Sequence, residues 1–222
     1  MNERRALSRG HGYGAVLALV LASASFQVAA PDSDWSRLVS IGLGAATLVT
    51  AVWAARAQHV VARAAAGATV ALAIAALVVL IVRGDVPEAP AALANGLLIA
   101  IAPAVIGAGL VRDIRAEGSV TVRTLSGVLA IYLLLGMVFS LLGIAVAAID
   151  DEPYFAGEPD ATRSDFLYFS YVTLSTTGFG DLSPVTDVGR MLAVIEALIG
   201  QIYLVTVVAI IVANLRPRGV RE

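Results

Sequence analysis

Apolar residues in this chain are grouped into six long runs, and polar residues lie mostly between them. A helix needs ~20 residues to cross ~30 Å of hydrocarbon, and ~17 to 25 residues are tolerated. The pattern therefore predicts six transmembrane helices and an all-α integral membrane protein. The runs cover residues 13–30, 38–55, 64–82, 91–111, 125–149 and 191–215.

A shorter aromatic and uncharged segment, residues 166–174, lies between the fifth and sixth runs. It is too short to span a bilayer as a helix. Inside a membrane every backbone polar group needs a partner, so such a segment is tolerated only where protein surrounds it. We therefore expect a re-entrant half-helix over residues 165–175, followed by a loop that begins at Thr176.

The composition fits a protein embedded in lipid. Hydrophobic residues make up 59 % of the chain and charged residues 14 %, whereas soluble domains average about 25 % charged residues. The chain has no Cys, so it forms neither a disulfide framework nor a thiolate metal site. A net charge of −2 gives no indication of a nucleic-acid partner.

The arginines predict how the chain is oriented. Eleven lie in the termini and in alternate loops, and four lie in the remaining loops, which also carry most of the acids. The positive-inside rule then places both termini in the cytoplasm and the loop after the half-helix outside the plasma membrane. The eleven are Arg4, Arg5, Arg9, Arg56, Arg63, Arg112, Arg115, Arg123, Arg216, Arg218 and Arg221, and the four are Arg37, Arg83, Arg163 and Arg190.

The first run also has features of a secretory signal peptide, because basic residues precede it and small residues end it. Pro31 would follow the cleavage point, and the run is longer than the usual signal core. We therefore expect the run to be retained as a span.

The string Thr176-Thr177-Gly178-Phe179-Gly180-Asp181 follows the half-helix. Carrying an ion through a membrane requires closely spaced oxygens that replace its hydration shell. Threonine offers a hydroxyl as well as a carbonyl oxygen, and glycines permit the unusual φ values that turn successive carbonyls the same way. The string is thus suited to an ion-selective filter.

Residues 166–215 resemble the pore module of the tetrameric potassium channels. The resemblance rests on the filter string, on Leu182-Ser183-Pro184-Val185-Thr186 after it, and on the Gly189-Arg190 pair that opens the last span. It covers about 90 residues if the fifth span is the outer helix. The implied organisation is a tail over 1–12, a four-helix domain over 13–124, a pore domain over 125–215 and a tail over 216–222.

The resemblance also assigns roles within the filter. Thr176 would bind the innermost K⁺ ion through its hydroxyl and its carbonyl, and Thr177, Gly178 and Phe179 would offer carbonyls to the ions above. Gly180 would close the outer end. Two later positions also receive roles. Asp181 would lie at the extracellular mouth, and Gly200 would fall at the hinge of the inner helix. Many family members have Val at position 177 and Tyr at position 179. Position 172, where some carry a Glu that pairs with the mouth Asp, is Val here.

Several polar and apolar positions of the last span have two interpretations. Gln201, Leu204, Val208 and Val212 follow helical spacing and would line the cavity and gate, or they serve ordinary helix packing. Glu196 lies one turn before Gly200. It either tunes the filter or gate, or bonds to a neighbouring helix near the interface.

These features together predict a potassium-selective channel rather than an enzyme. One filter strand cannot encircle an ion, so the expected partner is the chain itself as a homotetramer in membrane lipid. No cofactor is expected beyond the permeant K⁺ ions, and the sequence indicates no regulatory partner. The fourth run has no internal Arg, so we expect no voltage sensor.

Three other functions remain as alternatives. The first is a nonselective cation channel with the same pore. The second is an intramembrane aspartyl protease, because residues 178–181 fit a G-x-G-D pattern, but the second carboxyl that such a dyad needs is missing. The third is a transporter built from four pore-like repeats, of which this chain has one.

Overall fold

Within the part of the chain that the structure describes, all regular secondary structure is helical, apart from isolated β-bridges. The computed structural model describes residues 12–31, 33–56, 67, 71, 75, 78, 88–117, 120–149 and 152–214. The predicted all-α class is thus confirmed. The helices are α2 (Gly12–Ala29), α3 (Asp34–Ala54), α5 (Glu88–Glu117), α6 (Val122–Ala147), α7 (Arg163–Leu174) and α8 (Asp187–Asn214).

Five of these helices, all except α7, are long and apolar enough to cross a membrane. They correspond to the first, second, fourth, fifth and sixth predicted spans, with ends that differ by a few residues. The protein is therefore a multi-pass membrane protein. The predicted third span, residues 64–82, lies outside the described residues apart from four helical positions, Gly67, Ala71, Ala75 and Val78.

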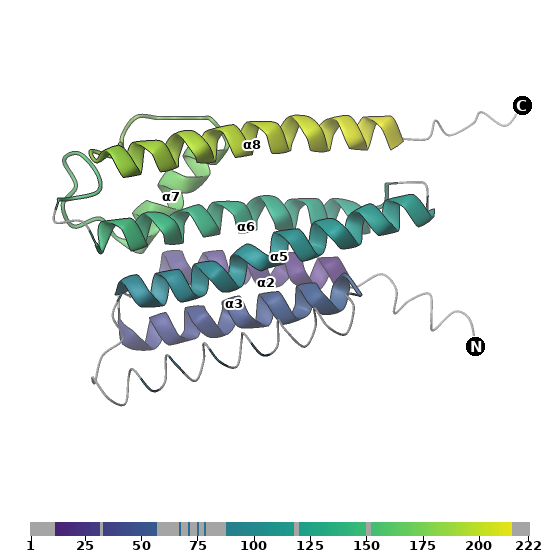
Figure 1. The fold of residues 1–222 in the computed structure, drawn as a ribbon, viewed down its shortest axis with the longest axis horizontal. Helices are drawn as coiled ribbons and strands as arrows, with labels where there is room; N and C mark the ends of the chain where they lie inside the picture. Colours follow the sequence, from purple (N-terminus) through teal and green to yellow (C-terminus); the bar gives the residue numbers. More distant parts are fainter. Residues whose placement is uncertain are drawn as a thin grey trace, which may run out of the picture.

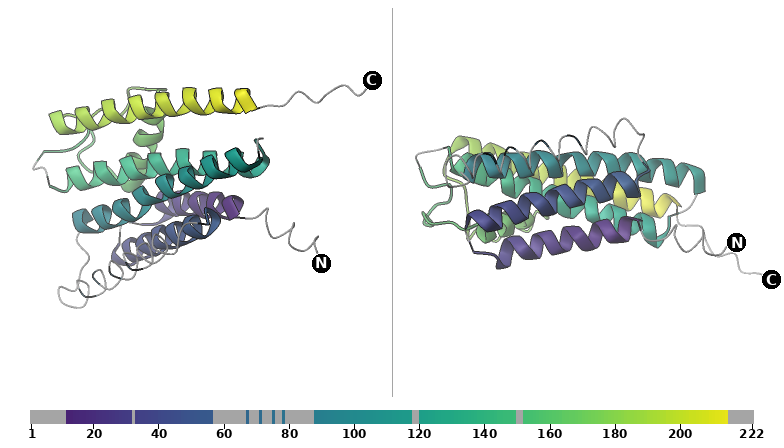
Figure 2. Two further views of the ribbon diagram at one scale, coloured as in Figure 1. Left: turned by 45° about the vertical axis from the view of Figure 1, so that its right-hand side comes forward. Right: turned by 90° about the horizontal axis from the view of Figure 1, so that it is seen from below.

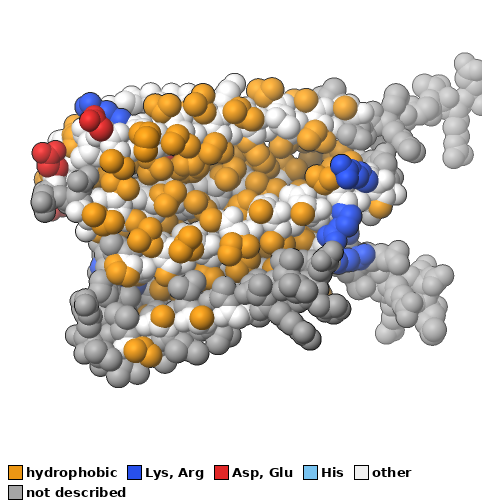
Figure 3. Space-filling model, viewed as in Figure 1, with side chains coloured by type: hydrophobic (Ala, Val, Ile, Leu, Met, Phe, Trp, Pro, Cys, Tyr) orange, Lys and Arg blue, Asp and Glu red, His pale blue; other side chains and the backbone are white. Residues whose placement is uncertain are grey.

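The long helices run side by side as a bundle, and the short α7 is packed between α6 and α8 at one end (Figures 1 and 2). We call this end, with loops 152–162 and 175–186, the filter end. The start of α2 and the end of α8 lie at the opposite end of the bundle (Figure 1). On the face shown in Figure 3, hydrophobic side chains fill the middle, acidic side chains lie at the filter end, and most basic ones lie at the opposite end.

One apolar core joins the first helices to the last ones. Tyr13, Val16 and Val20 of α2 are fully buried, and they belong to the same cluster as Leu134 of α6 and Phe155 of the loop before α7. Helix α2 packs against α6 and also against α7. The first span is therefore in direct contact with the segment predicted to form the pore.

Two arginines hold the opposite end of the bundle together. Arg112 of α5 donates a hydrogen bond to the carbonyl oxygen of Ala55, and Arg123 of α6 donates one to that of Ala54 at 3.4 Å. The last carbonyls of a helix lack intrahelical partners and carry the negative end of its dipole. Both guanidinium groups therefore stabilise the end of α3, and Arg123 also lies 4.9 Å from the ring centre of Tyr13.

Candidate functional site

Helix α7 begins at a capping box. The Asp165 carboxylate accepts hydrogen bonds from the backbone N–H and the hydroxyl of Thr162, both at 2.8 Å, and the Thr162 hydroxyl accepts from the Asp165 N–H at 3.4 Å. This arrangement satisfies N–H groups that a helix start leaves free. With 12 residues α7 is about 18 Å long, which is too short to span a bilayer. The predicted half-helix is confirmed, and it starts two residues earlier than expected.

An aromatic cluster packs against the first half of α7. The ring centres of Tyr154 and Phe155 lie 4.8 Å apart, and Phe155 lies 5.0 Å from both Phe166 and Phe169 of α7. The same loop is tied to the chain beyond the filter string, because the Val185 N–H donates to the Tyr154 carbonyl at 3.0 Å. The loop before α7 and the segment after the string are thus held together.

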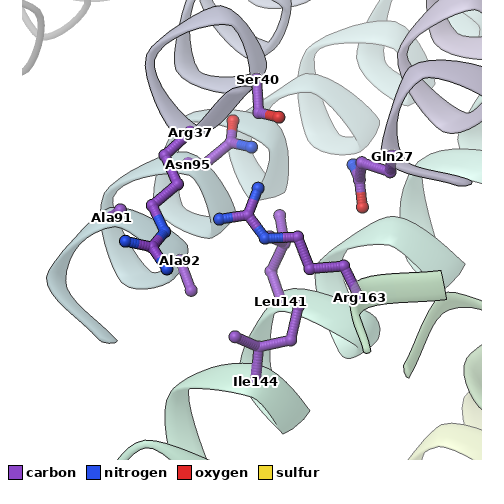
Figure 4. A pocket seen from close by; sticks show the side chains of 9 residues that line it. All are labelled: Gln27, Arg37, Ser40, Ala91, Ala92, Asn95, Leu141, Ile144 and Arg163. Atoms are coloured by element: carbon purple, nitrogen blue, oxygen red, sulfur yellow. The ribbon is translucent and has the colours of Figure 1, made fainter. Parts of the chain in front are cut away.

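Arg163, the first residue of α7, extends into a pocket at the filter end that is lined by both polar and apolar side chains (Figure 4). The other helices supply Gln27, Arg37, Ser40 and Asn95 to its lining. The Gln27, Ser40 and Asn95 side chains are almost fully buried. The pocket connects the start of α7 to α2, α3 and α5, a connection that the sequence did not indicate.

The filter string turns back on α7 as soon as the helix ends. The N–H groups of Thr177 and Gly178 both donate to the Val172 carbonyl, at 3.0 and 3.4 Å, and the Thr176 N–H donates to the Thr173 carbonyl at 2.9 Å. The last carbonyls of α7 are therefore partly satisfied by the string itself. The negative end of the helix dipole lies at the base of the string.

Every second residue of the string has a left-handed backbone. The φ angles are +56° at Thr176, +54° at Gly178 and +81° at Gly180. Alternation of this kind turns successive carbonyls toward the same side of a strand, and glycine adopts it without a steric penalty. The special backbone predicted at the two glycines is confirmed. Thr176 was not predicted to share it, and a non-glycine residue in this region stores strain of the kind found at functional sites.

Asp181, the residue predicted to lie at the extracellular mouth, is paired with a phenol. The Tyr168 hydroxyl of α7 donates to the Asp181 carboxylate at 2.7 Å, and this hydrogen bond lowers the pKa of Asp181 below its usual range. The Val at position 172 left the predicted mouth Asp without a carboxyl partner in the sequence. The structure supplies a hydroxyl instead, from one turn earlier on the same helix.

We expect Tyr168→Phe to raise the pKa of Asp181 toward its ordinary value. A lowered pKa means that Asp181 stays ionised above that pKa, and that the stabilisation from this bond is lost as the pH falls through it. In the variant the charge should therefore be lost at a higher pH. NMR titration of the Asp carboxyl carbons between about pH 2 and 7 measures this. The control is Tyr154→Phe. The Tyr154 hydroxyl does not bond to Asp181, so this variant should leave the titration curve unchanged. An unchanged curve in Tyr168→Phe would contradict the assigned hydrogen bond.

Only one face of helix α8 is covered by other parts of the chain. Glu196 and Gly200 are buried on that face, whereas Gln201, Leu204 and Val208 are exposed. Only 11 % of the span in α8 is buried, against 56 % of the span in α6. The residues predicted to line a cavity thus lie on a surface that a single chain leaves open. The Val212 side chain is outside the described part.

Gly200 lies where α8 comes closest to the end of α7. A Cβ built on it would collide with the carbonyl oxygen of Leu174 and would lie 2.9 Å from the carbonyl carbon. The predicted hinge at this position is not tested by a single conformation. The close approach of the two helices gives an independent reason for a glycine here.

These features define a class of protein, a multi-pass membrane protein whose last two long helices flank a short helix and a glycine-containing loop. The sequence model of a family described as "Ion channel" matches residues 127–216. The matched segment begins in α6 and includes α7, the string and α8.

The relatives that match are potassium channels. The chain is similar to human "Potassium voltage-gated channel subfamily A member 6", with 32 % identity over 40 % of this chain and 16 % of the relative. It is also similar to mouse "Potassium voltage-gated channel subfamily A member 10", with 28 % identity over the same shares. The Caenorhabditis elegans "Potassium voltage-gated channel protein shk-1" is 35 % identical over 34 % of this chain and 15 % of its own length.

The chain thus spans about one sixth of the length of these curated relatives. No solved structure matches it significantly.

Proposed function

We propose that four copies of this chain form a potassium-selective channel through which K⁺ moves passively. The observation that carries the proposal is the backbone of the filter string, with left-handed φ angles at Thr176, Gly178 and Gly180. Such a strand can present a row of carbonyl oxygens in place of the hydration shell of an ion. The similarity to proteins named as potassium channels supports K⁺ as the ion.

The exposed surface of the string supports a homotetramer. Residues 175–181 are exposed in the single chain, and Phe179 has 68 % of its surface uncovered. One strand supplies oxygens on one side of an ion only, so further copies around a central axis have to complete the site. The exposed positions Gln201, Leu204 and Val208 of α8 would then line the cavity below the filter. Val212 would continue this lining by its helical spacing.

The arrangement of charges supports a plasma-membrane location with both termini in the cytoplasm. Arg56, Arg112, Arg115 and Arg123 lie at the end opposite the filter, and the exposed acids Glu152, Glu158 and Asp160 lie at the filter end. An excess of basic residues marks the cytoplasmic side. The filter mouth with Asp181 would accordingly face outward.

Ion-substitution recording tests the proposal. With K⁺ on one side of the bilayer and Na⁺ on the other, we expect a reversal potential displaced by roughly 120 mV, because a hundredfold preference corresponds to two steps of about 59 mV. The same recordings over a voltage series should show no steep voltage dependence. A voltage sensor needs charges inside the membrane span, and the arginines of α5, Arg112 and Arg115, both lie in its last part. A reversal potential near zero would identify the alternative, a nonselective cation channel.

A further inference from the structure

Glu196 is the only buried carboxyl group among the residues that the structure describes, with 2 % of its surface exposed. It lies on the covered face of α8, and its Oε1 atom contacts the hydroxyl of Ser170 in α7. Neither of the ion pairs within the described part includes Glu196. A buried carboxylate with no cationic partner is strongly disfavoured in an apolar environment.

The hydrogen atoms around Ser170 restrict the state of this carboxyl group. The Ser170 hydroxyl oxygen lies 2.6 Å from the carbonyl oxygen of Gly136 in α6. A carbonyl oxygen only accepts hydrogen bonds, and a serine hydroxyl has one hydrogen to give. That hydrogen therefore has to point at Gly136, because two oxygens at this distance with no hydrogen between them would repel each other. The second contact, between Ser170 and Glu196, then needs its hydrogen from the carboxyl group.

We propose that Glu196 is a neutral carboxylic acid that donates its proton to Ser170 Oγ and thereby acts as a positioning residue, holding α8 against α7 and α6. The chain of bonds runs from the Glu196 carboxyl to the Ser170 hydroxyl and on to the Gly136 carbonyl. One acid group thus joins the three helices of the pore module.

The position of this chain of bonds connects it to the filter. Ser170 lies six residues before Thr176 on the helix that ends at the string, and Gly200 meets the Leu174 carbonyl one turn after Glu196. Ionisation of Glu196 would remove the donor to Ser170 and would place a charge in a buried site. The contact between α8 and the end of α7 should loosen as a result. This consequence for conduction rests on the proposed channel function.

Within the described part of the chain, two phenols have Glu196 in their electrostatic environment, Tyr132 of α6 and Tyr154 of the loop before α7. Burial raises the pKa of Tyr154 to about 12. This phenol is therefore neutral over the physiological range. A response to moderate alkalinity should accordingly come from Glu196.

Infrared spectroscopy of the reconstituted full-length chain tests the protonation state directly. At neutral pH the wild-type protein should show the carbonyl stretch of a protonated carboxyl group, with the downshift in D₂O that an exchangeable proton produces. Glu196→Gln should remove this band, and Glu158→Gln, at an exposed loop position, should leave it. A wild-type spectrum without the band, or a band that survives in Glu196→Gln, would overturn the proposal.

Potassium flux into vesicles as a function of pH tests the positioning role. Wild-type flux should fall by about tenfold or more as the pH is raised, since the loss of one partner from a buried hydrogen bond shifts an equilibrium by about that factor. Glu196→Gln should keep neutral-pH flux and lose this pH dependence, because its amide N–H donates to Ser170 as the acid does. Glu196→Ala should be impaired at every pH. Alkaline loss in Glu196→Gln equal to that of the wild type, or impairment equal to that of Glu196→Ala, would overturn the role.

The thermal midpoint of helix unfolding, measured by circular dichroism at neutral and alkaline pH, repeats this comparison without conduction. It should fall at alkaline pH in the wild type and stay constant in Glu196→Gln. A preparation that passes no K⁺ at any pH would contradict the proposed channel function, and the infrared band and the thermal midpoint would still decide the role of Glu196.

Discussion

Alanine in place of Gly178 or Gly180 is expected to abolish potassium-selective conduction. The two residues have φ angles of +54° and +81°, where an added Cβ costs about 1–2 kcal/mol per residue. In a tetramer the substitution is repeated four times around one ion path, so the strain sums to about 4–8 kcal/mol. The filter should relieve this strain by turning its carbonyls away from the path. Reversal potentials and K⁺ flux measure the loss.

Gly157 provides the matched control for this substitution. It has a similar φ angle of +78°, and a Cβ built there meets no atom within 4 Å, as at the two filter glycines. Gly157→Ala therefore introduces the same kind of strain in the loop before α7, away from the filter string. It should lower stability slightly and leave selectivity intact. Full selectivity in Gly178→Ala, or its loss in Gly157→Ala, would refute the assigned filter backbone.

The second large effect is expected at Gly200. A methyl group here collides with the Leu174 carbonyl at the end of α7, and overpacking of this kind costs about 1–3 kcal/mol. Gly200→Ala should therefore push α8 away from α7, lower the thermal midpoint and reduce conduction. Circular dichroism melts and K⁺ flux on the same preparation measure both effects.

Gly42→Ala is the control for Gly200→Ala. Gly42 lies within α3, and a Cβ built there has no atom within 4 Å, so alanine should be neutral or stabilising through its helix propensity. The comparison also separates two roles of Gly200. A hinge alone predicts altered opening with unchanged stability, whereas the close contact predicts lower stability. Equal melting of Gly200→Ala and Gly42→Ala would contradict the contact.

The long helices could be predicted from sequence because lipid imposes a length on apolar runs. The predicted span over 125–149, for example, corresponds to α6 at Val122–Ala147. The true start of α7 was also encoded, since Thr162 and Asp165 have the spacing of a capping box. The predicted half-helix follows the aromatic run instead, so its start at residue 165 is two residues later than the start of α7 at Arg163.

The contacts around the filter could not be predicted from sequence in the same way. The bond from Tyr168 to Asp181 and the chain from Glu196 through Ser170 to Gly136 depend on how three helices are rotated against one another. Helical spacing gives the face on which a residue lies, but it does not give the partner that the face meets. For this reason Glu196 had two interpretations in the sequence, and its contact with α7 became visible only in the structure.

The open face of α8 has a consequence for how the protein behaves when it is diluted with lipid. Lipid tails are as apolar as leucine, so the exposed side chains of a separated copy incur little hydrophobic penalty in a bilayer. Association into the proposed tetramer would then follow mass action, and the assembled fraction would depend on the number of copies per lipid. When the lipid-to-protein ratio is raised, the activity should fall more steeply than the number of copies per lipid falls. Purification in excess detergent should yield separated copies whose α6 and α7 remain packed through their own contacts.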